Sequence, residues 1–200
     1  CAACSTAIRA AAAGSDAVAA VEVNGLKIEY ESLGKPSDPP IVLIMGLGMQ
    51  LVAWPEAFCQ GLVERGFRCI VPDHIGYGFS DKPADVEYPL SFFTECIRQT
   101  LDAAGVTRCS LVGNSLGGAI ALQFALDYPQ MTEKLILMAP GGLNAKEEYF
   151  QMPGMQKMGQ VFSSGQAVTP AVMKDLFATS LMHDPRHATD ALIAERMEIM

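Results

Sequence analysis

The feature that most constrains this chain is a G-x-S-x-G pentapeptide, GNSLG, at residues 113–117. The apolar run CSLV at residues 109–112 leads into it, and the small-residue, helix-prone run GAIALQFAL at residues 118–126 leads out of it. A strand that turns into a helix within about one residue holds the central serine in strained backbone geometry, and flanking glycines let the two elements approach closely. We therefore predict a buried strand, a sharp turn and a helix at this place.

Such a turn gives Ser115 the surroundings that a nucleophile needs. Its hydroxyl is expected to point outward at the N-terminus of the helix. There the free N–H of Leu116 and the helix dipole stabilise a developing oxyanion. The pentapeptide alone has little specificity, so a glycine-rich turn with a bystander serine stays open as the plainer interpretation.

Strands alternate with helices over much of the chain, and Asn24-Gly25 predicts a hairpin between the first two strands. The expected strands are 17–23, 26–32, 41–45, 68–72, 109–112 and 134–138, the last of them buried, and the expected helices are 54–65, 91–104 and 118–126. This alternation indicates an α/β fold with a mostly parallel sheet covered by helices on both faces. Ligands of such sheets bind at the carboxyl ends of the strands.

The chain divides into three expected parts. Residues 1–20 form an alanine-rich tail, expected to be disordered, and residues 21–140 form the N-terminal part of the α/β core. Residues 141–200 contain no recognisable strand and predict an incomplete helical cap. Its methionines are expected either to line an adaptable apolar pocket or to pack a plain helical bundle.

Composition narrows the classes of partner. The net charge is −8 and no run of Lys or Arg occurs, so we expect neither nucleic acid nor a membrane as a partner. We expect a small-molecule substrate, and a homo-oligomer remains an option. Four of the six cysteines lie in apolar segments and are interpreted as reduced thiols of a cytoplasmic protein. A lipoprotein anchored through Cys1 is the alternative.

Together with the MGLG turn at residues 45–48 and the glycine-spaced loop at 73–81, the pentapeptide resembles the α/β-hydrolase superfamily. Residues 111–143 look like the meta-cleavage-product hydrolases, which cleave a C–C bond of 2-hydroxy-6-oxo-dienoates, and residues 183–200 look like the cap of those enzymes. The resemblance covers about residues 21–200. It implies an α/β-hydrolase fold with a helical cap, a serine hydrolase and no cofactor.

The resemblance also implies roles for particular residues. Ser115 matches the nucleophile, and the N–H groups of Leu47 and Leu116 match the oxyanion hole. Further residues match substrate-binding positions, and the last of them matches a cap arginine that contacts the acidic end of the substrate. They are Gly46, Gly48, Asn114 and Arg196.

Three departures from the family pattern widen the choice of substrate. Met45 stands where the family has a histidine before the oxyanion glycine, residues 48–50 lack the usual Gly-Pro-Gly character, and Met197 replaces a tryptophan. A carboxylesterase of the same fold is therefore the alternative activity. A ligand-binding protein without catalysis on the same fold is the alternative of another class.

The base and the carboxylate that a serine nucleophile needs are not evident. In this fold the histidine and the carboxylate both follow the nucleophile along the chain. The only histidines after Ser115 are His183 and His187, and both lie in the cap-like segment. No third ligand makes this pair a metal site, so we predict none. His74 precedes the serine and either borders the pocket or is an ordinary polar loop residue. We expect the triad Asp and His, with the last strands of the core, to lie beyond Met200.

Overall fold

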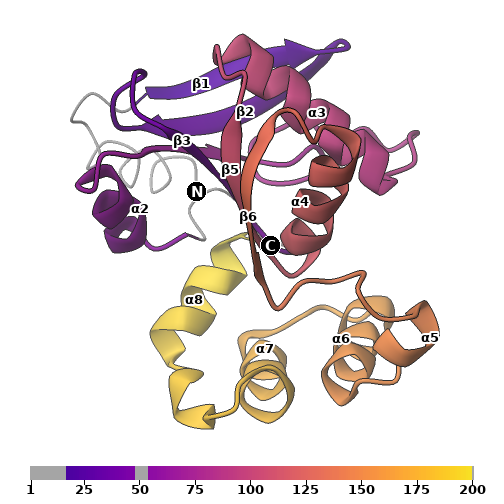
Figure 1. The fold of residues 1–200 in the computed structure, drawn as a ribbon. Coiled ribbons are helices and arrows are strands. Elements are labelled where there is room, and N and C mark those ends of the chain that lie inside the picture. The colour runs from indigo at the N-terminus through magenta and orange to yellow at the C-terminus, as the bar shows by residue number, and fades with distance from the viewer. Residues whose placement is uncertain (1–16, 48–53, 200) are drawn as a thin grey trace. The chain divides into compact units, whose positions relative to one another are not determined.

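The computed structural model describes residues 17–47 and 54–199, and these form two compact units that divide between Gly141 and Gly142 (Figure 1). The expected tail at residues 1–20 lies outside the described residues up to position 16, and the prediction is wrong for residues 17–20, which form part of a strand. The first unit contains the sheet. Its strands are β1 (Ala17–Val23), β2 (Leu26–Leu33), β3 (Pro40–Ile44), β4 (Arg68–Pro72), β5 (Cys109–Asn114) and β6 (Thr132–Met138). Its helices are α2 (Glu56–Val63), α3 (Leu90–Ala103) and α4 (Leu116–Asp127).

The sheet has the order β1-β2-β4-β3-β5-β6. The hairpin of β1 and β2 is antiparallel, β2 runs antiparallel to β4, and all other neighbours are parallel. Asn24 and Gly25 have φ of 53° and 78°, the left-handed geometry that a two-residue hairpin turn requires. The predicted α/β fold with a mostly parallel sheet is therefore confirmed.

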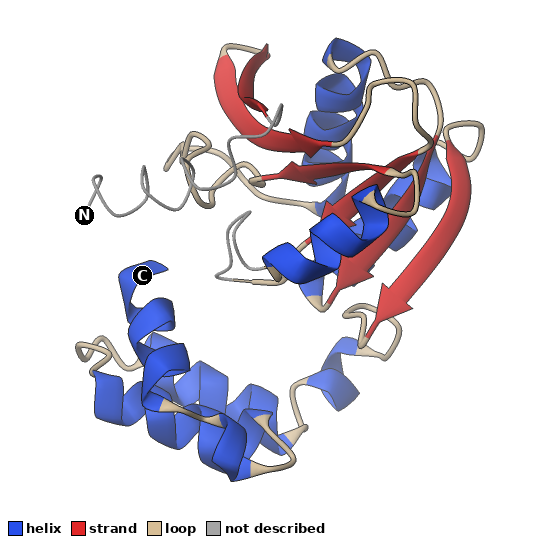
Figure 2. Cartoon of the chain, turned by 90° about the vertical axis from the view of Figure 1, so that its left-hand side faces the viewer, coloured by secondary structure: helices blue, strands red, loops and turns tan. Residues whose placement is uncertain are grey.

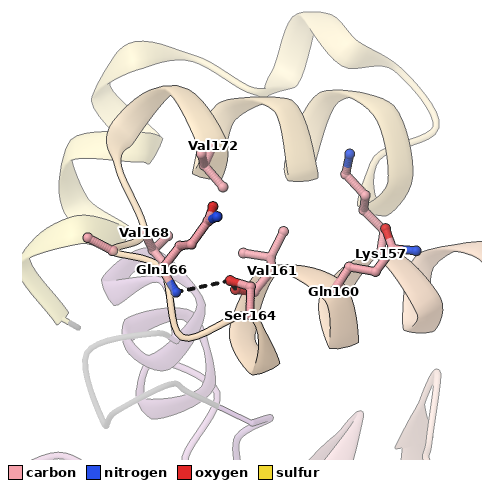
Figure 3. A pocket seen from close by; sticks show the side chains of 8 residues that line it. Lys157, Gln160, Val161, Ser164, Gln166, Val168 and Val172 are labelled. Carbon is pink, nitrogen blue, oxygen red and sulfur yellow. Dashed lines mark hydrogen bonds between the residues drawn. The ribbon is translucent and has the colours of Figure 1, made fainter.

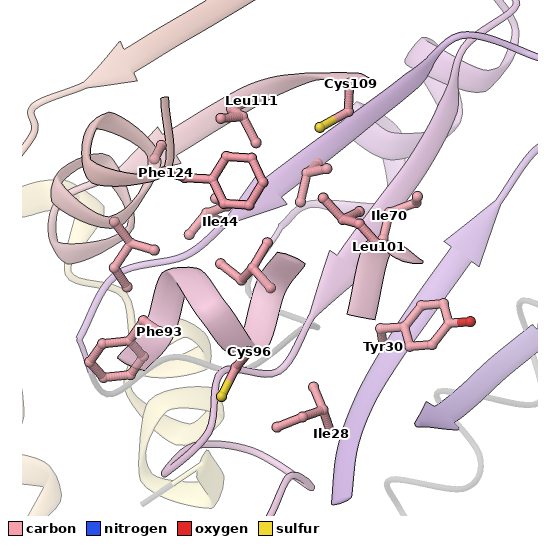
Figure 4. Close-up of a cluster of buried hydrophobic side chains, with 14 of the residues drawn as sticks. Ile28, Tyr30, Ile44, Ile70, Phe93, Cys96, Leu101, Cys109, Leu111 and Phe124 are labelled. Atoms are coloured by element: carbon pink, nitrogen blue, oxygen red, sulfur yellow. The ribbon is translucent and has the colours of Figure 1, made fainter. Parts of the chain in front are cut away.

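Alternating side chains of the central strands pack on opposite faces of the sheet. Val42 and Ile44 of β3 belong to a large cluster with residues of α3 and α4, whereas Leu43 belongs to a smaller cluster with Cys59 of α2. Figure 4 shows the larger cluster, in which Phe124 of α4 lies close to Ile44 and Leu111. Because both faces are covered, β3, β4 and β5 are almost continuously apolar.

The four described cysteines are all free and buried. Burial removes solvation from a thiolate and raises the pKa of the Cys59 and Cys109 thiols to about 12 and those of Cys69 and Cys96 to about 11. These side chains therefore act as small apolar core residues rather than as nucleophiles.

A strand forms at residues 134–138 as predicted, but the prediction that this strand is buried is wrong. In the sheet that residues 17–47 and 54–199 form, β6 stands at the end of the strand order and pairs with β5 alone. Leu135 and Leu137 pack against the larger cluster, but Ile136 and Met138 on the other face are 52% and 44% exposed. An edge strand covered on one face has a half-exposed pattern, which an apolar run in the sequence does not reveal.

Helices are the only regular secondary structure among the described residues of the second unit, and loops join them (Figure 2). The unit consists of α5 (Lys146–Tyr149), α6 (Pro153–Ser163), α7 (Pro170–Leu176), the π-helical turn Phe177–Leu181, the 3₁₀ turn Pro185–His187 and α8 (Asp190–Ile199). Met173, Leu176 and Ile193 form its small core, against which Met158 and Met197 pack. These three methionines pack as the plain-bundle interpretation expects, whereas Met152 is 41% exposed. Among the described residues, no helix has both the length and the apolar character needed to cross a bilayer.

Candidate active site

The candidate site is centred on Ser115, at the junction between β5 and α4. Its backbone has φ 54° and ψ −119°, a left-handed conformation that residues other than glycine rarely adopt. Positions 113 and 117 must be glycine because a β-carbon there would clash with neighbouring backbone atoms. A Cβ at Gly113 would lie 2.3 Å from the carbonyl oxygen of Gly117, and a Cβ at Gly117 would lie 2.2 Å from that of Ile44. The predicted strand, sharp turn and helix are therefore present.

Backbone hydrogen bonds hold this turn in place. The Ser115 N–H donates to the carbonyl of Met138 at the end of β6, over 3.1 Å. The Ser115 carbonyl accepts from the N–H groups of Gly118 and Gly141, over 3.0 and 2.8 Å. The side-chain amide of Asn114 donates to the same Met138 carbonyl, over 3.1 Å. The strain at the serine is thus balanced by anchors from its own helix and from the neighbouring strand.

The loop after β3 lies directly beside this turn. A Cβ at Gly46 would lie 3.2 Å from the Cβ of Ser115 and 3.4 Å from the side-chain oxygen of Asn114. The structure therefore brings together three of the residues that the sequence singles out, although they come from different strands. Leu47 follows in a turn and is 58% exposed, and Gly48 lies outside the described residues.

The Ser115 hydroxyl is not used to hold the structure together. The serine occupies the N-cap position of α4, yet its side chain makes no capping hydrogen bond, and no other hydrogen bond of the hydroxyl is found within residues 17–47 and 54–199. The side chain is half-buried. Leu116 is the first residue of α4, where an N–H has no carbonyl partner inside the helix. An uncommitted hydroxyl beside such an N–H suits nucleophilic attack and charge stabilisation.

His74 follows β4 and contacts the loop that lies beside Ser115. It is 3% exposed, and its Nε2 donates to the carbonyl of Met45, over 3.2 Å. Burial lowers the pKa of this imidazole to about 4, so it is neutral near pH 7. Its position between Asp73 and Ile75, both fully buried, follows from the wrapping of the loop against β2.

The remaining predicted residues belong to the second unit. Arg196 of α8 is half-buried, and its Nε and Nη1 atoms are buried without a hydrogen-bond partner among the described residues. Its Nη1 lies 3.7 Å from the Glu195 carboxylate. His183 and His187 are exposed, and the Asp184 carboxylate caps a 3₁₀ turn by accepting the N–H of Arg186.

A shallow pocket of about 160 Å³ also lies in the second unit (Figure 3). Lys157, Gln160 and Val161 of α6 line it together with Val172 of α7. None of the residues predicted for the site contributes to it. Among the described residues, no group of three or more acidic, histidine or cysteine side chains is arranged to hold a metal ion.

Comparison with known proteins places this geometry in a family. A model of the alpha/beta hydrolase fold family matches residues 39–192. A 2-hydroxy-6-oxo-6-phenylhexa-2,4-dienoate hydrolase of Burkholderia cepacia is 33% identical over 159 residues, which are 78% of this chain and 54% of that protein. A hydrolase of the same name from Comamonas testosteroni is 29% identical over 181 residues, 88% of this chain and 61% of that protein. The chain thus spans about half the length of the curated relatives that it matches.

Solved structures agree with the sequence relatives. The crystal structure of a meta-cleavage product hydrolase is 25% identical, with a TM-score of 0.75 over 91% of this chain and 63% of that one. The resemblance to meta-cleavage-product hydrolases is therefore confirmed. On the match over residues 39–192 and the strand, turn and helix around Ser115, this chain belongs to the α/β-hydrolase fold family.

Proposed function

We propose that this chain carries the nucleophile and the oxyanion hole of a serine hydrolase that cleaves a C–C bond in a 2-hydroxy-6-oxo-dienoate. The single observation that supports the chemistry most is the left-handed backbone of Ser115, with Gly46 packed against it. The substrate class is supported by the relatives, which are hydrolases named for such dienoates. No step in this proposal needs a cofactor.

In the proposed reaction, the Ser115 oxygen, or a water molecule that it helps to activate, adds to the keto carbonyl. The N–H groups of Leu47 and Leu116 hold the negative charge that develops on the carbonyl oxygen. The C–C bond then breaks, its electron pair passes to the carbon of the leaving dienol acid, and that carbon takes up the proton that the base accepted from the attacking group. Where Ser115 is the attacking group, water then hydrolyses the acyl-serine and releases the carboxylic acid. The proton of the hydroxyl passes to a base.

The base is expected from outside these 200 residues. No hydrogen bond joins the Ser115 hydroxyl to a histidine within the described part of the chain, and the imidazole of His74 is committed to Met45 through Nε2. The relatives are considerably longer than this chain, which leaves room in such proteins for a histidine and a carboxylate. The full-length protein is therefore the right material for the tests.

The first test asks whether Ser115 is a nucleophile at all. The full-length protein and its Ser115→Ala variant are treated with a fluorophosphonate probe, and the labelled protein is quantified. We expect labelling of the wild type only, because the probe reacts with an activated serine hydroxyl. Absence of labelling in the folded wild type would instead favour a ligand-binding protein without catalysis, and equal labelling of both proteins would show that the reactive residue is not Ser115.

The second test separates the C–C hydrolase from a carboxylesterase. The latter is favoured by Met45, whose side chain is 1% exposed and offers no polar group next to Gly46, where the family has a histidine. Turnover of a 2-hydroxy-6-oxo-dienoate is compared with that of a nitrophenyl ester. A kcat/KM that is higher for the ester by a factor of ten or more, on the order of 1.4 kcal/mol, would decide for the esterase.

Arg196 provides a further test of the substrate's acidic end. Its buried Nε and Nη1 lack hydrogen-bond partners among the described residues, so a carboxylate ligand would satisfy them. We expect Arg196→Ala to raise KM for the dienoate, by about tenfold or more, while turnover of the neutral ester changes little. Arg186→Ala is the matched control, since that arginine is 88% exposed and pairs with Asp184. Equal KM changes in both variants would remove Arg196 from the substrate site.

A further inference from the structure

We propose that His74 is a positioning residue for the oxyanion hole. Through its hydrogen bond to the Met45 carbonyl, it fixes the peptide that leads into Gly46 and Leu47. This inference rests on the proposed function, because it assigns His74 a task in the same site. His74 itself is not proposed to touch the substrate.

The chemistry of the hydrogen bond fixes the state of the ring. A carbonyl oxygen only accepts, so the 3.2 Å contact requires the proton on Nε2. Nδ1 is then a lone-pair acceptor, and it is buried without a partner in the described residues. The ring meets Tyr77 and Phe93 edge-on, with centroid distances of 6.3 and 6.0 Å. The neutral state that burial imposes keeps this single tautomer near pH 7.

Packing alone does not account for a histidine here. A leucine or a phenylalanine would fill the same space without leaving an unpartnered nitrogen in the core. The imidazole of His74 leaves Nδ1 buried without a hydrogen bond from any described residue, which is unfavourable, but it supplies one hydrogen-bond donor at Nε2. The donor is therefore the property that distinguishes His74 from an apolar residue, and within the described residues it bonds to the Met45 carbonyl.

The Met45 peptide is held from a second side by the helix that follows Ser115. A Cβ at Gly117 would lie 2.5 Å from the Met45 oxygen, so that oxygen is close both to the His74 ring and to the backbone of α4. A peptide unit is planar, and the direction of the Met45 carbonyl therefore sets the direction of the Gly46 N–H. Gly46 is the residue that packs against Ser115, and the proposed oxyanion donor, Leu47, is next along the chain.

His74 can act as a support because its own loop is fixed to the sheet. The Asp73 N–H donates to the Glu29 carbonyl of β2, over 2.8 Å. The Glu29 N–H donates to the Ser80 hydroxyl, which donates in turn to the Asp73 carbonyl, over 2.9 and 2.7 Å. The Asp73 carboxylate accepts the Phe79 N–H, over 2.8 Å. The loop is thereby closed on itself and on β2, directly beside His74.

The test compares two substitutions of similar size in the full-length protein. His74→Phe keeps a ring but has no donor, and His74→Gln places an amide N–H₂ as many bonds from Cα as Nε2. We expect His74→Phe to lower kcat by about 10-fold to 100-fold with KM within about twofold, since a displaced oxyanion donor affects the transition state. His74→Gln should recover most of this loss. His187→Phe, at an exposed histidine, is the matched control and should leave kcat unchanged.

A measurement independent of turnover separates this inference from the proposed function. In ¹⁵N spectra of selectively labelled protein, His74 should show the Nε2–H tautomer, and the Gly46 and Leu47 amides should shift in His74→Phe and return in His74→Gln. Unshifted amides in a folded His74→Phe, or an unchanged kcat, would overturn the role of His74. If the wild type turns over neither substrate while the two His74 variants still show these shifts, the proposed function is overturned and the support of the loop by His74 stands.

Discussion

At the scale of single residues, the backbone of Ser115 depends on glycines that leave no room for a β-carbon. We expect Gly117→Ala to lower the free energy of unfolding by about 1–3 kcal/mol or more, because its Cβ would meet the rigid carbonyls of Ile44 and Met45 at 2.2 and 2.5 Å. The same clash would push the loop after β3 away from Ser115. Urea unfolding gives the stability, and labelling by a fluorophosphonate reports on the site.

The control for this substitution lies in the same unit. Gly61 is inside α2, and a Cβ there would meet only the far end of the Arg65 side chain, at 3.4 Å. Gly61→Ala should therefore be neutral or stabilise the protein by about 0.5–1 kcal/mol, the usual preference of a helix for alanine. A Gly117→Ala variant as stable as Gly61→Ala would contradict the close approach of α4 and β3.

The sequence was informative at residues whose role is local. A glycine on each side of Ser115, between an apolar run and a helix-prone run, predicts the strained turn because the constraint acts within a few positions. His74 and Met45 are 29 positions apart, and no local pattern encodes a hydrogen bond between their loops. The roles of Leu47, Gly48 and Arg196 rest on the resemblance and remain predictions.

At the scale of elements, a carboxylate on α3 joins that helix to the end of α4. Glu95 accepts hydrogen bonds from Arg98 over 2.7 Å, from Gln99 over 2.6 Å and from the Tyr128 hydroxyl over 2.8 Å. These donors, the Arg98 guanidinium above all, lower the pKa of the Glu95 carboxyl from 4.5 to about 2. The ionised form is therefore the one that stabilises the folded protein.

The sign of the pH dependence follows from this lowered pKa. Between pH 4.5 and about 2 the unfolded chain binds the proton at Glu95 while the folded protein does not, so stability falls as the pH falls through this window. Above pH 4.5 the contribution is fully present. Glu95→Gln should lose stability at pH 7 and show a shallower decline in acid, measured by urea unfolding at several pH values. Glu133→Gln, an exposed residue of β6, is the control and should follow the wild-type curve.

Periodicity in the sequence predicts which helices and strands form. It does not predict which of them keep one face exposed to solvent. The alternation of Leu26–Leu33 and the apolar run of β3 give the strands directly, and Pro55 and Pro170 mark helix starts. The exposure of Ile136 follows from the place of β6 at the end of the sheet, which depends on the whole strand order. The π-helical turn Phe177–Leu181 after α7 likewise follows from no local pattern of residues.

At the scale of the whole molecule, the two units differ in how much apolar surface they bury. Two clusters on either side of the sheet form the core of the first unit, with Val42, Leu43 and Ile44 at 0% exposure. The one cluster found in the described part of the second unit has three buried apolar side chains, Met173, Leu176 and Ile193. Smaller cores open with lower free energy, so we expect amide hydrogens of α6, α7 and α8 to exchange faster than those of β3, β5 and α4. Equal protection in both units, measured by hydrogen exchange, would contradict this difference.

One substitution tests whether the second unit is stabilised by its own cluster. Leu176 is 1% exposed between Met173 and Ile193, and truncation of such a leucine costs about 2–5 kcal/mol. Leu176→Ala should therefore abolish amide protection in α6, α7 and α8 while β3, β5 and α4 keep theirs, since their clusters contain none of its neighbours. Leu143→Ala, in the same unit but 61% exposed, should leave both patterns unchanged. Loss of protection in the sheet as well would show that the units unfold together, because stability would then be shared across the chain rather than set by each core.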